Sequence, residues 1–501
     1  SAKRILVPII ESQHPSTNHI LIIAKALQIR GAKVKVLLCG ELLEGCEVKS
    51  IKNEKVNDKC WDCRLNKNLL FPLYGLEIIK LGDIIDDQEL LDSKNQSFEF
   101  LKDNAEINLD GINLRTSVDD SVTRYYFGKL PNDKSEILKI KQQHILTALI
   151  TTKIAQKIDQ DWSPDIVFNN MSAYSAWEGF TNYYKLNGNR FHSINMTPFD
   201  FNRIILDSYE FLISNKRFNK YVEYRNHETL TKSENELLDS FLQQRFKGTS
   251  MIFKEYGYFE ELPLGIIEDQ INLNKDKKNI FLFSNLYWDI GISEMGGLFD
   301  NVIDWVISTV HLLKGSKDIN LYIKPHPAEI YDSQSSLKGI KEIVMNEFPE
   351  MPENIFFIDP QLKIKSYDLF PFIDLGVIFT GTLGLEMLLA GVPLVSAGQV
   401  PYAGLKFSGE PNTESAYSDY LNFKKNPPIP DNDFLRIYAY FYFIRCRIPW
   451  NLTSRVYGER FKGFTFKNLD EMKVGSNKQL DHICKCIMES DNSVPEAWPE
   501  M

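Results

Sequence analysis

No apolar run in this 501-residue sequence approaches the ~20 residues that a membrane-spanning helix needs. The first apolar stretch, Ile5 to Ile10, is too short for a signal peptide and leads into polar residues. We therefore expect a cytoplasmic protein, with peripheral attachment to the inner face of the membrane as an open alternative. Lys134, Lys139 and Lys141 are the candidate contacts for such a surface, although lysine clusters are usually solvated helix faces.

Basic residues are fewer than acidic residues. The chain has 57 Lys and Arg against 67 Asp and Glu, which gives a net charge of -10. General nucleic-acid binding requires a basic face, so the sequence predicts no nucleic-acid partner.

Cysteines are few, and their number is odd. Seven thiols fit a reducing compartment better than a disulfide framework. Four of them follow a C-x6-C-x13-C-x2-C spacing, which leaves a zinc or iron–sulfur site, a redox pair and plain buried thiols open. The upstream spacing is irregular, so we predict no metal and favour buried thiols at Cys39, Cys46, Cys60 and Cys63.

Length and composition predict two large domains. A chain of 501 residues exceeds what one hydrophobic core usually serves, and 43% hydrophobic with 25% charged residues is ordinary for a globular protein. We place an N-terminal domain with a helical insertion at 1–215, a helical connector at 216–278, a second domain at 279–450 and a helical tail at 451–501.

The first domain opens like an α/β fold that lacks a full G-x-G-x-x-G fingerprint. Buried strands are predicted at 3–10, 32–39, 164–170 and 189–195, with helices at 17–29 and 174–186 and a mainly helical stretch at 66–160. Repeated strand–helix units predict a doubly wound sheet. Polar residues near the strand ends are expected to face the ligand cleft: Asn169, Asn170, Ser172, Glu178, His192, Asn195 and Asp200.

The second domain holds the most informative stretch, from Asp318 to Gly404. A predicted strand at 320–324 stops at Pro325-His326-Pro327, and a later strand at 375–379 opens into Thr380-Gly-Thr-Leu-Gly-Leu-Glu386 and an apolar helix. A histidine at one strand end and a small-residue turn before a helix suit a phosphorylated ligand, because first-turn N–H groups are unpaired. The pattern points to a nucleotide or nucleotide-sugar site.

These motifs carry a family resemblance over residues 279–410. Lys324-Pro-His-Pro-Ala-Glu329, Thr380 to Pro393, Pro401-Tyr-Ala-Gly404 and Ser284-Asn-Leu-Tyr-Trp-Asp289 resemble segments of the bacterial capsule polysaccharide biosynthesis family, which includes the β-Kdo transferases. The resemblance implies a GT-B architecture, in which two Rossmann-like domains face a central cleft and C-terminal helices cross back. It also implies a metal-independent transferase with no resident cofactor.

Each residue of the predicted donor site has an assigned role. His326 would bind or protonate the donor phosphate. Lys324 lies either in the site or on the sheet surface, since strand alternation alone does not decide this. Thr380, Gly381, Thr382 and Gly384 form a turn that is predicted to contact the phosphate. Glu386 is predicted to accept hydrogen bonds from the ribose hydroxyls, and Asn285, at a strand end, is a further predicted contact. Trp288 is either a stacking platform or a core residue.

The catalytic carboxylate is expected in the first domain, where GT-B enzymes usually supply it. The candidates are Glu11, Glu178, Asp200 and Asp207, and strand-end positions favour Glu11 and Asp200.

Three functions remain open. The first is a glycosyltransferase that takes a sugar from a nucleotide donor, with CMP-Kdo or another CMP-linked acidic sugar favoured, and adds it to a surface glycan or lipid-linked glycan. The second is a GT-B-like polyol-phosphate transferase or sugar epimerase. The third is a non-catalytic subunit that binds nucleotide or glycan. A carboxylate in the first domain separates the transferase from the binding subunit.

Overall fold

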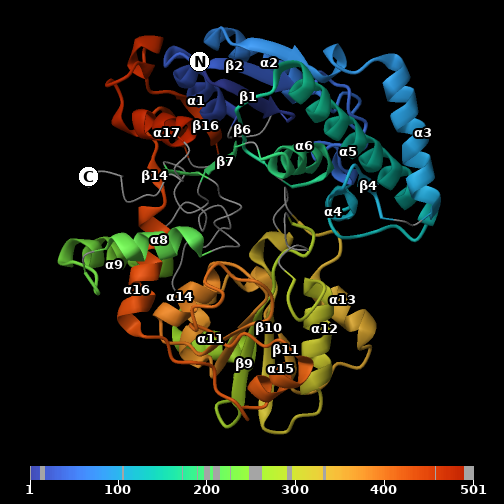
Figure 1. Ribbon diagram of the computed structural model, residues 1–501. Coiled ribbons are helices and arrows are strands. Elements are labelled where there is room, and N and C mark those ends of the chain that lie inside the picture. Colours follow the sequence, from blue (N-terminus) through green and yellow to red (C-terminus); the bar gives the residue numbers. More distant parts are fainter. Residues whose placement is uncertain are drawn as a thin grey trace. The chain divides into compact units, whose positions relative to one another are not determined.

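The computed structural model divides the chain into two compact units (Figure 1). It describes residues 2–11, 17–103, 106–171, 173–188, 190–196, 203–206, 215–225, 227–247, 262–289, 296–330, 335–456 and 459–489. Unit 1 comprises Ser1–Tyr209 and Arg447–Met501, and unit 2 comprises Glu210–Cys446. The predicted connector, 216–278, falls inside unit 2, and the predicted tail, 451–501, falls inside unit 1.

Unit 1 is built on a seven-stranded sheet. Its strand order is β14-β8-β7-β6-β1-β2-β3. The five strands from β7 to β3 are parallel, whereas β8 pairs antiparallel with both β7 and β14. The strands are β1 (Arg4–Ile9), β2 (Lys33–Leu38), β3 (Glu77–Lys80), β6 (Ile166–Asn169), β7 (Arg190–Met196), β8 (Arg203–Leu206) and β14 (Ile448–Pro449).

Helices cover both faces of this sheet. One hydrophobic core joins the sheet to α1 and α17, and another joins it to α5 and α6. Strands buried on two faces read as continuous apolar runs, which is why β1 and β6 are visible in the sequence. The helices are α1 (Thr17–Ile29), α2 (Trp61–Leu70), α3 (Asp87–Asp103), α4 (Arg115–Tyr125), α5 (Lys134–Trp162), α6 (Ser175–Leu186) and α17 (Lys478–Met488).

Short elements complete unit 1. They are two hairpins and four short turns of helix: β4 (Asn108–Leu109) with β5 (Ile112–Asn113), β15 (Thr453–Val456) with β16 (Glu459–Phe464), η1 (Ile51–Asn53), η2 (Phe71–Tyr74), η3 (Leu81–Asp83) and η9 (Leu469–Met472).

Unit 2 is built on a five-stranded, fully parallel sheet with the order β11-β10-β9-β12-β13. Its strands are β9 (Lys278–Phe283), β10 (Ile319–Lys324), β11 (Ile355–Phe357), β12 (Leu375–Ile378) and β13 (Leu394–Ser396). One face packs on α12, α13 and α15. On the other face Gly376 of β12 lies against Met387 of α14, where a side chain would not fit.

The helices of unit 2 in the described ranges are α8 (Lys216–Tyr224), α9 (Lys232–Phe246), α11 (Leu264–Ile271), α12 (Val302–Leu313), α13 (Ile340–Glu347), α14 (Leu383–Leu389), α15 (Glu414–Leu421) and α16 (Asn432–Tyr440). Shorter turns are η5 (Pro327–Ile330), η6 (Pro360–Leu362), η7 (Ser366–Phe372) and η8 (Phe441–Arg445).

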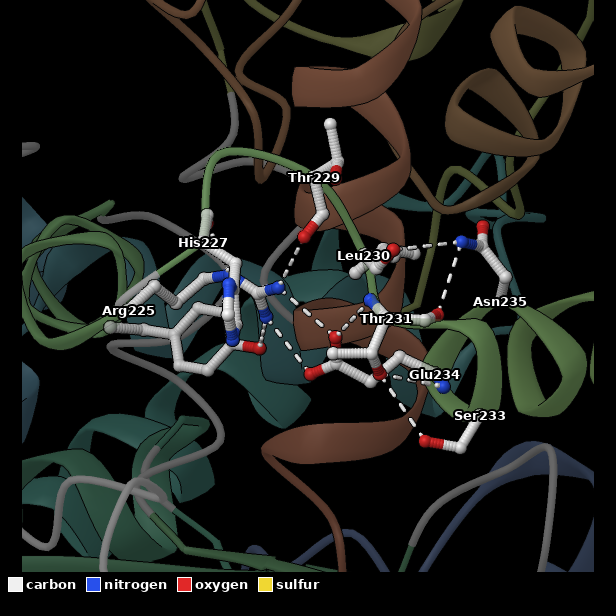
Figure 2. Close-up of polar contacts among 9 residues, drawn as sticks. Arg225, His227, Thr229, Leu230, Thr231, Ser233, Glu234 and Asn235 are labelled. Carbon is white, nitrogen blue, oxygen red and sulfur yellow. Dashed lines mark hydrogen bonds and ion pairs between the residues drawn. The ribbon is translucent and has the colours of Figure 1, made fainter.

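A buried arginine fixes the connection between α8 and α9 (Figure 2). The Arg225 guanidinium donates to both carboxylate oxygens of Glu234 at 3.0 Å, to the Thr229 carbonyl at 2.9 Å and to the Tyr221 hydroxyl. Glu234 also accepts from the Thr231 N–H at 2.9 Å, while the Thr231 hydroxyl accepts from the Glu234 N–H. This capping box explains why α9 begins where it does.

The α/β class and the doubly wound parallel sheets are confirmed. The helix predicted at 17–29 matches α1, and the strand predicted at 320–324 falls within β10. The helical tail predicted at 451–501 contains the helix α17, but it also contains the strands β15 and β16, which were not predicted. The strands β3 and β8 also escaped prediction. No helix in the described ranges has the length and apolar character to cross a bilayer.

Candidate functional site

The strand order of unit 2 creates a switch point between β9 and β12. The chain runs from β9 outward through β10 to β11, and then returns to place β12 on the other side of β9. Ligands of open α/β sheets bind beyond the carboxyl ends of the strands at such a point. Ser284 and Asn285 follow β9 there, Thr380 and Gly381 follow β12, and His326 lies two residues after the neighbouring β10.

Asn285 connects the two strand ends. Its Nδ2 donates to the Thr380 carbonyl at 3.3 Å. Gly381 has φ +112°, a conformation that side chains rarely adopt, and a Cβ placed there would lie 3.8 Å from Asn285 Nδ2. The requirement for glycine at this turn therefore comes from its backbone conformation rather than from crowding.

Three polar side-chain atoms at these strand ends are buried without a hydrogen-bond partner in the described structure: Ser284 Oγ, Asn285 Oδ1 and Lys324 Nζ. Lys324 is 2% exposed. An unpaired buried ammonium is costly, and unpaired buried groups at one sheet edge indicate a site completed by something bound. Ser284 was not among the predicted site residues, because a serine after a strand has no signal of its own.

Burial controls the protonation of the two basic groups. It lowers the pKa of Lys324 to about 8, with Asp368 acting in the opposite direction. Burial, followed by the charge of Lys324, lowers the pKa of His326 to about 4. His326 Nδ1 accepts the Ala328 N–H at 3.1 Å, which assigns the proton of the neutral ring to Nε2. A bound anion would raise both pKa values.

The rest of the predicted turn has structural roles as well. Thr380 Oγ1 donates to the Gln399 carbonyl at 2.6 Å, and Thr382 is the residue before α14. A Cβ on Gly384 would collide with the hydroxyl of buried Tyr402 and with Ile378. Gly384 is thus required for helix–strand packing, and its contact with a ligand stays a prediction.

Glu386 lies in an internal ion pair. Its Oε1 accepts from Arg245 Nε at 2.8 Å, and its Oε2 accepts from the Tyr367 hydroxyl at 2.9 Å. The carboxylate is 1% exposed. Ribose binding by Glu386 stays a prediction, and any such contact would add to a carboxylate that already has two protein partners.

We expect Arg245→Met to lower the free energy of unfolding by about 3–5 kcal/mol, because it leaves the Glu386 charge buried and unpaired. Chemical denaturation measures this change. The double variant Arg245→Met/Glu386→Leu should recover most of the loss. Lys232→Met on the same helix is the control, since that side chain is 92% exposed and its pair with Glu236 contributes at most ~1 kcal/mol. An equal loss in the double variant would contradict the ion-pair explanation.

Trp288 is a packing residue in this structure. It is 3% exposed, and its Nε1 donates to Ser336 Oγ at 2.8 Å. Its stacking on a base or sugar stays untested.

The switch point of unit 1 lies between β1 and β6 and also carries polar groups. Glu11 follows β1, is 6% exposed and accepts the Glu47 N–H at 3.1 Å. Asn169 and Asn170 end β6, and both have buried side-chain atoms without a partner in the described structure. Glu178 lies in α6 and accepts from Asn182 at 3.0 Å. The candidates Asp200 and Asp207, and likewise Ser172, lie outside the described residues.

The four clustered cysteines line one small cavity of about 40 Å³ in unit 1. All four are free thiols: Cys39, Cys46, Cys60 and Cys63. Among the residues with described positions, no group of three or more His, Cys, Asp or Glu side chains is arranged to hold a metal ion.

Comparison with known proteins gives only distant similarities. No family model matches the sequence, and no curated protein matches it significantly. Among solved structures, KpsC of Thermosulfurimonas dismutans, a β-Kdo 2,7 transferase, is 12% identical with a TM-score of 0.33, covering 57% of this chain and 79% of its own. A glycosyltransferase from Rickettsia africae is 10% identical with a TM-score of 0.30, covering 98% and 100%.

A third similar structure is an epimerase. UDP-GlcNAc 2-epimerase from Neisseria meningitidis, bound to UDP-GlcNAc, is 10% identical with a TM-score of 0.23, covering 87% of this chain and 99% of its own. With TM-scores below 0.5, these similarities carry no argument about activity. The function of this chain has to follow from its own residues.

Proposed function

We propose that the protein is a GT-B glycosyltransferase that transfers a sugar from a nucleotide donor to a surface glycan or lipid-linked glycan. CMP-Kdo or another CMP-linked acidic sugar is the favoured donor, and capsule or surface polysaccharide synthesis the favoured pathway. Both preferences come from the motif resemblance of residues 279–410.

The observation that carries the proposal is the Lys324 ammonium, which has no hydrogen-bond partner in the described structure. It is buried beside His326 at the carboxyl edge of the unit 2 sheet, next to the unpaired Ser284 and Asn285 oxygens. A bound phosphate would supply a hydrogen-bond acceptor and further negative charge for Lys324, and it would favour the protonated form of His326. Hydroxyls of the nucleotide or sugar would pair with Asn285 Oδ1 and Ser284 Oγ.

The proposed chemistry requires only side chains. Negative charge develops on the donor phosphate as its bond to the sugar breaks, and preorganised donors aimed at that charge lower the barrier. Lys324 and His326 would do this without a bound cation. His326 would be protonated once the phosphate binds, and could then pass its Nε2 proton to the leaving group. Peripheral membrane attachment stays a prediction. Lys141 is paired with Asp119 at 2.7 Å, and Lys139 is exposed.

Lys324→Met tests the donor site directly. In the wild type, CMP or UDP at 100 times its dissociation constant should add about 2.7 kcal/mol to the free energy of unfolding. In Lys324→Met that nucleotide-dependent shift should be lost. The ligand-free variant should be more stable than wild type by roughly 1–3 kcal/mol at neutral pH, because a buried ammonium without a hydrogen bond in the described structure is replaced by an apolar side chain of similar length.

The sign of this stability change follows from the pKa. The pKa of Lys324 is lower in the folded state than in the unfolded chain, so its contribution to stability is present at high pH and is lost as pH falls through about 8. The stabilisation by Lys324→Met should therefore shrink towards pH ~10. Exposed Lys317→Met is the matched control. A nucleotide shift that survives in Lys324→Met, or no shift with any nucleotide in the wild type, would overturn the proposal.

A further inference from the structure

Two buried carboxyl groups meet at the switch point of unit 1. Glu11 follows β1, and Glu47 lies in the segment between β2 and η1. The Glu47 N–H donates to Glu11 Oε1 at 3.1 Å, and the two carboxyl groups are within hydrogen-bonding reach of each other. Two carboxylates only repel, so a hydrogen bond between them requires one proton.

A hydrogen-bonded chain holds Glu47 in place. Ser121 on α4 donates its hydroxyl to Glu47 Oε1 at 3.0 Å, and accepts the first N–H of α6, from Ser175, at 2.9 Å. Both interactions are fixed by secondary structure, so the Glu47 carboxyl has little freedom to turn away. Glu11 is held in turn by the Glu47 N–H.

Among the described residues, one cation acts on both carboxyl groups. Arg124, one turn after Ser121 on α4, lowers the pKa of Glu11 and of Glu47 by its charge. His144 on α5 bonds Ser175 Oγ at 2.7 Å, and burial lowers its pKa to about 3, which keeps it neutral. Cys46 is a buried thiol whose pKa is raised by burial and by both carboxyls, while Lys49 opposes that rise. Within the described part of the chain, Arg124 therefore acts on both acids, and Lys49 acts on their neighbours Cys46 and His144.

We propose that Glu11 and Glu47 form a dyad that shares one proton, with Glu47 as the positioning residue that orients Glu11 and sets its proton affinity. The inference rests on the proposed function, in which the ionised oxygen of the dyad takes the proton of an acceptor hydroxyl. The electron pair of the broken O–H bond then forms the new bond between the acceptor oxygen and the sugar, and the donor phosphate leaves with the electrons of the broken sugar–phosphate bond. The atoms and charges balance without a further reactant.

Burial supports the shared proton. It raises the pKa of Glu11 well above the usual range, and the charge of Glu47 raises it further. Burial also raises the pKa of Glu47, while hydrogen bonds from its partners lower it. The two acids thus lose protons in separate steps that belong to the pair. Near neutral pH the dyad can keep one proton and still present one ionised oxygen.

Infrared titration of the protein with ¹³C-labelled glutamate tests the dyad without any assay of transfer. The wild type should show a protonated-carboxyl band that disappears as pH rises through neutral. Glu11→Gln and Glu47→Gln should each move that loss at least about one pH unit lower, because the remaining carboxyl no longer faces a like charge. Glu44→Gln, an exposed neighbour, should leave it unchanged. A band that survives either dyad variant at its original pH would overturn the proposal.

Thermal unfolding gives a second measurement that needs no isotope. A carboxyl with a raised folded-state pKa stabilises the protein at low pH and loses that contribution as pH rises through the raised value. The melting temperature of the wild type should therefore fall between pH ~5 and ~8, and Glu47→Gln should flatten the slope. An equal slope in Glu47→Gln would contradict a shared proton.

Kinetics separate positioning from simple structural support. Glu47→Gln should keep measurable turnover while the acidic limb of the kcat profile moves at least about one unit lower, and Glu47→Asp should move it part of the way back. If Glu47→Gln only destabilised the protein, it would change the amount of active enzyme and leave the acidic limb of the kcat profile at its original pH. That result would refute the positioning role. If the infrared titration behaves as expected and no nucleotide sugar is turned over, the dyad stands and its role in transfer falls with the proposed function.

Discussion

Replacing His326 by alanine should lower kcat by about 10²- to 10⁴-fold, the usual loss when a positioned acid or base is removed. The imidazole lies two residues after the end of β10, where its Nδ1 accepts the Ala328 N–H at 3.1 Å. The same replacement should abolish the nucleotide-dependent rise in melting temperature, since the ring would bind the donor phosphate. Turnover of the donor that emerges from a nucleotide screen, together with thermal unfolding, measures both effects.

His311→Ala is the matched control for His326→Ala. His311 is an exposed residue of α12 in the same unit, and its described contacts are with other residues of that unit, Lys314, Glu347 and Phe348. Its removal should leave kcat within twofold of wild type, as expected of an exposed side chain. Undiminished nucleotide binding in His326→Ala would remove His326 from the site.

Removing the catalytic carboxylate of unit 1 should abolish turnover and spare nucleotide binding. Glu11→Gln and Asp200→Asn are the first choices, because Glu11 follows β1 and Asp200 follows a predicted strand. An oxocarbenium-like transition state needs a carboxylate as base or nucleophile, so we expect a loss of at least about 10³-fold in one of them. Exposed Glu44→Gln should retain turnover. Full activity in both variants would place the catalytic group elsewhere.

Chelation completes this test. If Lys324 and His326 meet the phosphate charge, turnover should survive EDTA unchanged. A loss of activity that Mg²⁺ or Mn²⁺ restores would show that a metal ion stabilises the phosphate charge.

The sequence predicted the sheets where burial is continuous. Strands such as β1 and β6 are almost entirely apolar, so their pattern is visible without any tertiary information. β3 (Glu77–Lys80) was missed because it is a short, charged edge strand that is mostly exposed. The segment of β14, β15 and β16 was predicted as helix, because aromatic residues such as Tyr438 and Phe441 give a helical pattern up to η8. Pro449, Gly458 and Gly463 follow that pattern and mark its end.

The candidate sites were predictable where a motif marked them and hidden where only folding assembled them. His326 and Gly381 follow strands in recognisable turns. The side of the sheet on which Lys324 lies was undecidable from alternation, and only the structure shows that its ammonium is buried without a hydrogen-bond partner in the described residues. Ser284 and Glu47 have no sequence signal, because the partners that define their roles are distant along the chain. Ser121 lies 74 residues after Glu47.

The return of the chain to unit 1 after Cys446 has a consequence for synthesis on the ribosome. Unit 2 is one unbroken stretch, Glu210–Cys446, whereas unit 1 takes its edge strand β14 and the core helix α17 from the last part of the chain. Translation therefore completes unit 2 first, and the apolar face of α1 that α17 covers stays open until residues 478–488 emerge. A nascent or C-terminally truncated chain would expose that face to chaperones and proteases while unit 2 is already complete.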